Sequence, residues 1–200
     1  MRTVIEVNFY NSKKAKVKLD DGFTFALYRG ELRKYHISSG ATISDDNIKT
    51  IVEDILNKRA KERALHMLKD SSKTKKQVID KLKQSYYPDC TIEYVIRFLE
   101  KYNYIDDENY TRFYIENYKS SRSIQKMKLE LYKKGINQSI INSIFEDTDI
   151  NQQDALDNLL AKKMGRYNIN NEKDKVRLYN LILRNGFSYE EASRALRERQ

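Results

Sequence analysis

Apolar and polar residues alternate with a period of two over the first thirty residues. The alternation runs through Ile5, Val7 and Phe9, and it resumes at Val17 and Leu19. This period places every second side chain on one face of an extended chain. We therefore predict a small three-stranded region within residues 1–30, which needs a helix over one face to be stable in water.

Turn and cap residues separate this region from a helix that follows it. Asp21-Gly22 predicts a tight hairpin in which both residues have positive φ. Ser44 predicts an N-cap, with Asp45 and Asp46 in the first turn, where the helix dipole favours anions. The apolar stripe of this helix consists of Ile48, Ile51, Val52, Ile55 and Leu56, and it continues to Leu65 and Leu68.

From about residue 60 onward, the same pattern of apolar, capping and helix-ending positions occurs three times. Val78, Met127 and Leu178 superpose at offsets of 49 and 51 residues. The same offsets align N-caps with N-caps and helix ends with helix ends. The N-cap column contains Thr74, Ser123 and Asp174, and the column after the same helix contains Tyr86, Gly135 and Gly186. A period near 50 residues with one apolar face per helix is typical of a helical array.

Each repeat accommodates three predicted helices. We therefore predict a mainly α chain, in which three tandem three-helix repeats form an elongated array after a small β-hairpin or three-strand region and a helix. The expected divisions are 1–59 for the strands and their helix, 60–105 for the first repeat, 106–150 for the second and 151–200 for the third.

The charge and the cysteine content narrow the class of protein. A formal net charge of +9 in 200 residues favours an anionic partner, such as nucleic acid, an acidic protein surface or a membrane surface. No stretch approaches 18 apolar residues, and the first residues contain no apolar leader. Cys90 is the single cysteine and cannot form an internal disulfide bond. These features indicate a cytoplasmic protein.

Residues that carry catalysis are scarce. His36 and His66 fall in different modules, Cys90 has no histidine near it, and the sequence contains no phosphate-binding glycine loop, serine elbow or metal-ligand spacing. Asp106-Asp107 would suit a Mg²⁺-dependent nuclease. The stronger interpretation is that the pair lies at the start of the second repeat's first helix, where acidic N-cap and first-turn residues are expected. We therefore expect no enzymatic activity, no metal and no cofactor.

Basic residues recur in the repeat columns. Lys126 and Lys133 are seven residues apart, as are Arg177 and Arg184, so each pair shares a helix face. Such a face suits phosphates or a carboxylate-rich protein groove, unless it is merely solvated. The candidate binding residues are Lys73, Arg122, Lys126, Lys133, Lys134, Lys173, Arg177 and Arg184, of which Lys73, Arg122 and Lys173 precede the predicted N-caps.

Three motifs, in this order, resemble those of the RecX family. Residues 105–115 are similar to the family's LDDxxFAxxF motif, residues 124–136 to its I…ELxxKGI motif, and residues 185–188 to its RGFS motif. The chain departs from the family at Tyr86, where a glycine is common, and at 120–122, which lack the usual glycine. The resemblance covers about residues 60–200.

The resemblance implies a regulator of recombination, DNA repair and the SOS response. Such a protein lies along the filament that RecA forms on DNA and contacts successive RecA subunits. It blocks filament growth or promotes disassembly, and so lowers ATPase, strand exchange and coprotease activity. The expected partners are the RecA filament and single- or double-stranded DNA, contacted directly or through RecA. The resemblance implies that no cofactor is needed, since ATP belongs to the partner. From the repeat architecture we expect a monomer, and we expect no membrane partner.

Two other classes of function stay open. Helix-turn-helix-like repeats would bind DNA without RecA and with sequence preference. A generic helical scaffold would bind an unrelated protein. Measuring the ATPase of RecA on single-stranded DNA, with and without the chain, separates these alternatives.

Overall fold

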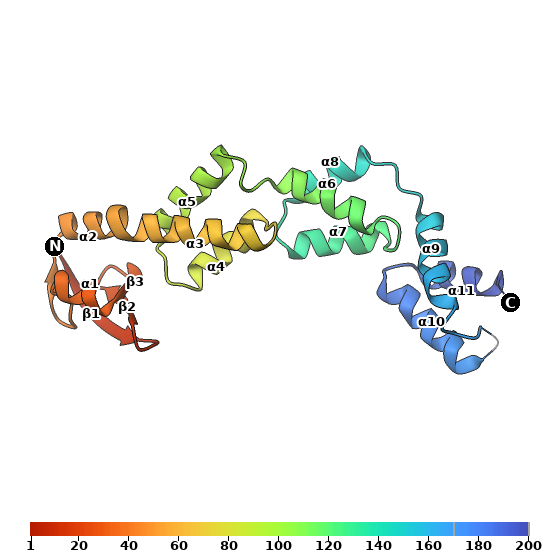
Figure 1. Cartoon of the computed structure of the whole chain (residues 1–200), viewed down its shortest axis with the longest axis horizontal. Coiled ribbons are helices and arrows are strands. Elements are labelled where there is room, and N and C mark those ends of the chain that lie inside the picture. The colour runs from red at the N-terminus through yellow and green to blue at the C-terminus, as the bar shows by residue number, and fades with distance from the viewer. Residues whose placement is uncertain (170, 200) are drawn as a thin grey trace. The chain divides into compact units, whose positions relative to one another are not determined.

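A computed structural model describes residues 1–169 and 171–199 of the chain (Figure 1). The chain divides into two compact units, Met1–Asp106 and Asp107–Gln200. Helices dominate both units, and a small antiparallel sheet lies near the N-terminus, as the sequence predicts. Among the described residues, no helix is both long and apolar enough to span a membrane. The elongated arrangement of the repeats stays a prediction.

The N-terminal sheet has four strands in the order β3-β2-β1-β4. The strands are β1 (Arg2–Phe9), β2 (Lys14–Leu19), β3 (Thr24–Tyr28) and β4 (Thr42–Ile43). The expectation that strands end by residue 30 is wrong, because β4 pairs with the start of β1. A two-residue strand is too short to show alternation in the sequence. The short helix α1 (Arg29–Lys34) was not predicted either.

A three-residue loop closes the hairpin between β2 and β3. The backbone N–H of Leu19 donates to the carbonyl of Phe23 at 2.9 Å, and the N–H of Gly22 donates to the carbonyl of Leu19 at 3.0 Å. Gly22 has a φ of 85°. Asp21 does not have a positive φ, so the prediction is wrong for that residue, since a three-residue loop needs only one left-handed position.

One helical stretch follows the sheet without interruption. It consists of α2 (Asp45–Thr50), a π-helical segment η1 (Ile51–Leu56) and α3 (Asn57–Asp70). The Ser44 side chain accepts a hydrogen bond from the backbone of Asn47, which confirms the predicted N-cap. The apolar stripe of this stretch joins the sheet and the next two helices in one core.

The three repeats each contain three helices, as predicted. The first repeat consists of α3, α4 (Lys75–Lys83) and α5 (Asp89–Lys101), the second of α6 (Asp107–Tyr118), α7 (Ile124–Lys133) and α8 (Gln138–Glu146), and the third of α9 (Gln152–Met164), α10 (Glu172–Arg184) and α11 (Tyr189–Arg197). The first repeat shares its core with the sheet, whereas the second and third repeats each have a core of their own.

Two of the three predicted N-caps in the aligned column are confirmed. Thr74 caps α4 and Ser123 caps α7 through their side-chain oxygens. The prediction for Asp174 is wrong, because Asn171 caps α10 and accepts from the backbone N–H groups of residues 173 and 174. The extra turn of α10 therefore places Lys173 inside the helix instead of before it. Superposing apolar columns cannot reveal an added turn at a helix start.

The aligned helix ends share one backbone conformation. Gly135 and Gly186 have φ values of 84° and 86°, and Tyr86 adopts the same left-handed region with a φ of 59°. Glycine enters this region without a steric cost, whereas a residue with a side chain is strained there. The departure from the family at Tyr86 therefore changes the residue type but not the left-handed backbone conformation of the turn.

Candidate binding surface of the second and third repeats

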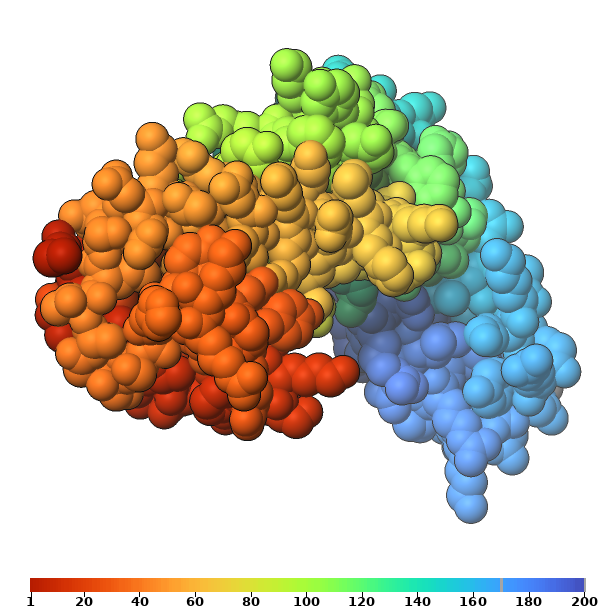
Figure 2. All heavy atoms as spheres, turned by 60° about the vertical axis from the view of Figure 1, so that its left-hand side comes forward, coloured from red at the N-terminus to blue at the C-terminus, as the bar shows by residue number. Residues whose placement is uncertain are grey.

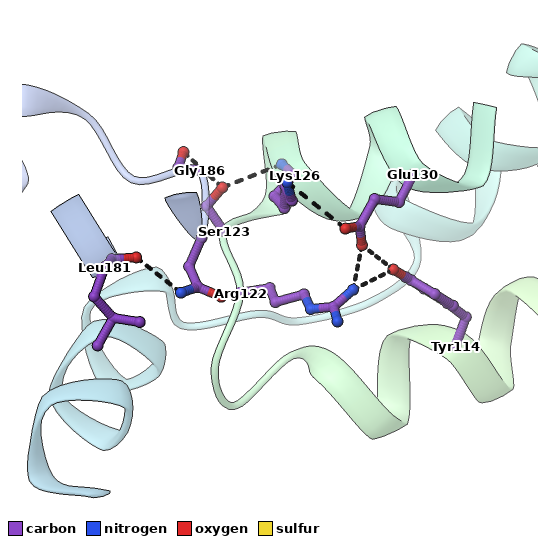
Figure 3. A network of polar contacts seen from close by, with 8 residues as sticks. Tyr114, Arg122, Ser123, Lys126, Glu130, Leu181 and Gly186 are labelled. Carbon is purple, nitrogen blue, oxygen red and sulfur yellow. Dashed lines mark hydrogen bonds and ion pairs between the residues drawn. The ribbon is translucent and has the colours of Figure 1, made fainter. Parts of the chain in front are cut away.

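A polar network on the second repeat holds two of the candidate cations (Figure 3). Arg122 precedes α7 and forms an ion pair with Glu130 on that helix. The Arg122 guanidinium also donates to the Tyr114 hydroxyl of α6 at 2.6 Å, and that hydroxyl donates to Glu130. The Lys126 ammonium lies 3.7 Å from the same carboxylate. Three donors thus converge on one acidic group.

Stacking fixes Arg122 further. Its guanidinium carbon lies 3.7 Å from the centre of the Tyr118 ring, and only 26% of its side chain is exposed. A guanidinium over an aromatic face is attracted by the negative charge of the ring face. Lys134 lies over two rings of the same helix, 5.7 Å from the centre of Tyr110 and 6.0 Å from that of Tyr114. Arg122 therefore links α6 to α7.

The network shifts two pKa values in opposite directions. Burial alone would raise the pKa of the Glu130 carboxyl, but the Tyr114 hydrogen bond and the charges of Arg122 and Lys126 outweigh it and lower that pKa. Burial, followed by the hydrogen bond to Glu130, raises the pKa of the Tyr114 hydroxyl. Both shifts favour a charged Glu130 and a neutral Tyr114 at neutral pH.

The second repeat is joined to the third at the N-cap of α7. The Ser123 N–H donates to the Asn185 carbonyl at 3.0 Å, and the Ser123 hydroxyl donates to the Gly186 carbonyl at 2.7 Å. A Cβ added to Gly186 would lie 2.5 Å from both the Ser123 hydroxyl and the Lys126 Cβ. We call these contacts between Ser123 and residues 185–186 the clasp. The clasp places Lys126 at the junction of two repeats.

The remaining candidates of the second unit lie on more open surface. Lys133 is exposed at the end of α7, and Lys173 is exposed in the first turn of α10. Arg177 is exposed and pairs with Asp174 at 3.0 Å. Arg184 is exposed, and its Nε donates to the Asn180 carbonyl at 3.1 Å. These four side chains are therefore accessible to a partner.

The structure does not bring all eight candidates into one site. Arg122, Lys126 and Lys134 gather around Tyr114 and Glu130 in the second repeat. Lys73 belongs to the first unit and bonds to the Ser71 hydroxyl. Tyr114 and Glu130 were not among the sequence candidates, although both lie in motifs that resemble the family. Their place in those motifs is the signal from which the sequence could have identified them.

The acidic residues at the start of α6 do not form part of a metal cluster. Among the described residues, no group of three or more histidine, cysteine or acidic side chains is arranged to hold a metal ion. Asp107 and Glu108 instead occupy the first turn of α6, where the helix dipole stabilises negative charge.

The three-helix units, their separate cores and their repeated caps define the class, a helical-repeat protein with a small N-terminal sheet. A family model described as "RecX, first three-helix domain" matches residues 60–99. The regulatory protein RecX of Clostridium beijerinckii is 31% identical, over 98% of this chain and 94% of its own length. That of Clostridium tetani is also 31% identical, over 97% and 92%. The chain belongs to the RecX family.

Solved structures agree with this assignment. The crystal structure of RecX from Lactobacillus salivarius is 26% identical and has a TM-score of 0.56, over 72% of this chain and 96% of that one. Another structure, described as a crystal structure of regulatory protein RecX, has a TM-score of 0.57 over 96% and 98% of the two chains. At 20% identity, this second likeness concerns the fold. The family resemblance drawn from the three sequence motifs is confirmed.

Proposed function

We propose that this chain binds the filament that RecA forms on DNA and inhibits filament growth, and with it ATPase, strand exchange and coprotease activity. The observation that carries the proposal is the set of exposed cations on α7 and α10 of a RecX-family chain. We infer that the chain acts in the cytoplasm as a monomer, without catalysis of its own.

The exposed members of the basic columns are the proposed contact residues. Lys133, Lys173, Arg177 and Arg184 keep open surface, so an anionic partner can approach them. Exposed charges contribute little to folding but act together on an oppositely charged surface. Arg122 is proposed as a positioning residue, because its guanidinium is paired with Glu130 and stacked on the Tyr118 ring. Lys73, Lys126 and Lys134 complete the set.

The test compares two triple variants of equal charge change. Lys133→Glu/Arg177→Glu/Arg184→Glu should weaken inhibition of RecA ATPase on single-stranded DNA by at least about tenfold, because each reversal replaces attraction with repulsion. The control, Lys49→Glu/Lys69→Glu/Lys162→Glu, changes exposed lysines on other helices and should inhibit like the parent. Both should keep the helix content of the parent.

The salt dependence separates this proposal from its alternatives. Inhibition by the parent should weaken as salt increases, since exposed charges are screened. Equal loss in both triple variants would mean that only net charge matters. Inhibition like the parent's in the first variant, at every salt concentration, would show that this face is merely solvated. Binding to DNA without any effect on RecA would favour an independent DNA-binding function.

A further inference from the structure

Exposed aromatic residues and cations gather at one end of the N-terminal sheet. Phe9 and Tyr10 lie where β1 ends, Lys14 where β2 begins, Tyr28 where β3 ends and Arg29 where α1 begins. The register brings them together, since Lys14 pairs with Tyr28 and the N–H of Tyr10 donates to the Lys14 carbonyl. We call these five residues the sheet-end surface; they belong to the red and orange strand region at the front of Figure 2.

The aromatic side chains of this surface are partly exposed, and the Tyr28 ring also carries Arg59 at 4.5 Å from its centre. Phe9 is 48% exposed, Tyr10 43% and Tyr28 37%. Isolated apolar side chains on a surface are ordinary, but three rings at one sheet end form a patch. The charged side chains lie against the rings: Arg29 is 4.4 Å from the centre of Phe9, and Lys14 is 4.5 Å from the centre of Tyr28.

The patch extends on both sides. The Tyr86 ring, from the turn after α4, lies 5.2 Å from that of Tyr10 and carries Lys16 at 5.1 Å. On the other side, Phe9 and Arg29 line a shallow cavity of about 670 Å³ together with Arg33 and His36. Among the described residues, the lining of this cavity includes no carboxylate.

The two ends of the sheet differ in charge. Asp20 and Asp21 occupy the hairpin at the opposite end, where Arg2 pairs with Asp21. At the sheet-end surface, the Glu31 carboxylate is already engaged: it forms an ion pair with Arg59 and accepts from the Tyr28 N–H at 2.8 Å. The cations at this end therefore face solvent with little compensation, which favours an anionic ligand.

We propose that the sheet-end surface binds single-stranded nucleic acid directly. Bases stack on Phe9, Tyr10 and Tyr28, while Lys14 and Arg29 turn from the ring faces of Tyr28 and Phe9 to contact the phosphates. Proteins that bind single strands combine these two elements, a cationic track and aromatic platforms, because every base has a face on which it can stack. A duplex hides those faces in its own stack. This site is separate from the proposed contact residues for RecA, and its test contains no RecA.

The test measures binding of a fluorescent 20-nucleotide oligo(dT) to the full chain by anisotropy. The parent should bind this strand at least about tenfold more tightly than a 20-base-pair duplex. Phe9→Leu/Tyr28→Leu keeps apolar volume but removes the stacking faces, and it should weaken binding at least about tenfold. The control, Tyr94→Leu/Tyr102→Leu, removes two exposed tyrosines of the same unit and should change binding less than about twofold.

A charge variant tests the same surface without altering the rings. Lys14→Ala/Arg29→Ala removes two phosphate contacts, so the slope of log affinity against log salt should fall by about 1.4. If circular dichroism shows that the leucine pair does not fold, the lysine and arginine variant still tests the surface, and an unchanged slope would contradict the phosphate contacts. Oligo(rU) of the same length identifies which type of single strand binds more tightly.

Two results would overturn the proposal. Equal affinity for duplex and single strand, unchanged by the folded leucine pair, would mean that stacking plays no part. The second result is that polyglutamate binds as tightly as oligo(dT), and that both bind more weakly to the charge variant but not to the leucine pair. This would assign the surface to acidic protein segments. RecA inhibition is measured separately, so neither result bears on the contacts proposed for α7 and α10.

Discussion

The turns at Tyr86 and Gly186 occupy the same position in two repeats and share a left-handed backbone conformation, yet they contact different parts of the chain. At Gly186, a Cβ would lie 2.5 Å from the Ser123 hydroxyl and from the Lys126 Cβ. At Tyr86, the side chain reaches the Tyr10 ring at a centroid distance of 5.2 Å. The turn at Gly186 packs closely against the second repeat, whereas the turn at Tyr86 extends a side chain toward the sheet.

This difference shows that the repeats diverge where they meet other parts of the chain. A left-handed residue with a side chain costs about 1–2 kcal/mol, so glycine is the default at a helix end. In the first repeat, the contact of Tyr86 with Tyr10 and Lys16 offsets part of that cost. In the third repeat, close packing against Ser123 allows no side chain at all.

The largest effect is expected for Gly186→Ala. The methyl group adds the left-handed penalty to overlap with Ser123 and Lys126, so the free energy of unfolding of the second unit should fall by about 3 kcal/mol. Urea unfolding followed by circular dichroism measures it. Gly40→Ala is the matched control, because Gly40 has a φ of 83° with no atom near its missing Cβ, and it should cost about 1 kcal/mol. Equal losses in both variants would show that the clasp is not closely packed.

A smaller effect, which depends on pH, is expected for Glu130→Gln. The carboxylate accepts charge-assisted bonds from Tyr114 and Arg122, so the variant should lose about 1.5 kcal/mol of unfolding free energy at pH 7. The control Glu116→Gln removes an exposed ion pair with Lys119 and should change stability by less than about 0.5 kcal/mol.

The sign of the pH dependence follows from the lowered pKa of Glu130. A carboxyl whose pKa is lower in the folded state stabilises the fold above its unfolded pKa, which is near 4.5, and loses that contribution as the pH falls through the folded value. The parent should therefore approach the stability of the glutamine variant as the pH falls below about 4.5. A difference that stays constant from pH 7 to pH 3 would contradict the network.

The smallest effect is expected for Tyr86→Gly. Relief of the left-handed strain, about 1 kcal/mol, opposes the loss of the Tyr10 and Lys16 contacts and the greater freedom of glycine in the unfolded chain. The net change in the free energy of unfolding of the first unit should stay within about 1 kcal/mol, as measured by urea unfolding. A loss above about 2 kcal/mol would mean that the ring supports the core of the first unit and does more than extend its surface.

Local signals in the sequence predicted much of the fold. The caps at Thr74 and Ser123 and the glycines at 135 and 186 depend on nearby residues, so their types reveal them. The N-cap of α10 at Asn171 was missed because Asn171 and Asp174, one helical turn apart, can both cap a helix, and the spacing of apolar residues does not choose between them. The strand β4 was missed because it exists only through its pairing with β1.

The candidate surface was predictable only in part. Helical spacing correctly placed Lys133, Arg177 and Arg184 on exposed positions, since the core face of each helix is visible in the sequence. The spacing does not reveal that Arg122 bonds to Glu130 and Tyr114. The sheet-end surface was missed for a similar reason, because its rings come from the ends of β1 and β3, which only their shared pairing with β2 brings together.

The clasp also bears on how the second unit unfolds. Repeats that touch weakly unfold one at a time, whereas a strong interface makes neighbours open together. The Ser123 amide hydrogen bonds to the Asn185 carbonyl of the next repeat, so it exchanges with solvent only when that interface opens. The Ser123 amide belongs to the second repeat, but the carbonyl that protects it from exchange belongs to the third. A single backbone position thus reports the cooperativity between two repeats that each have a core of their own.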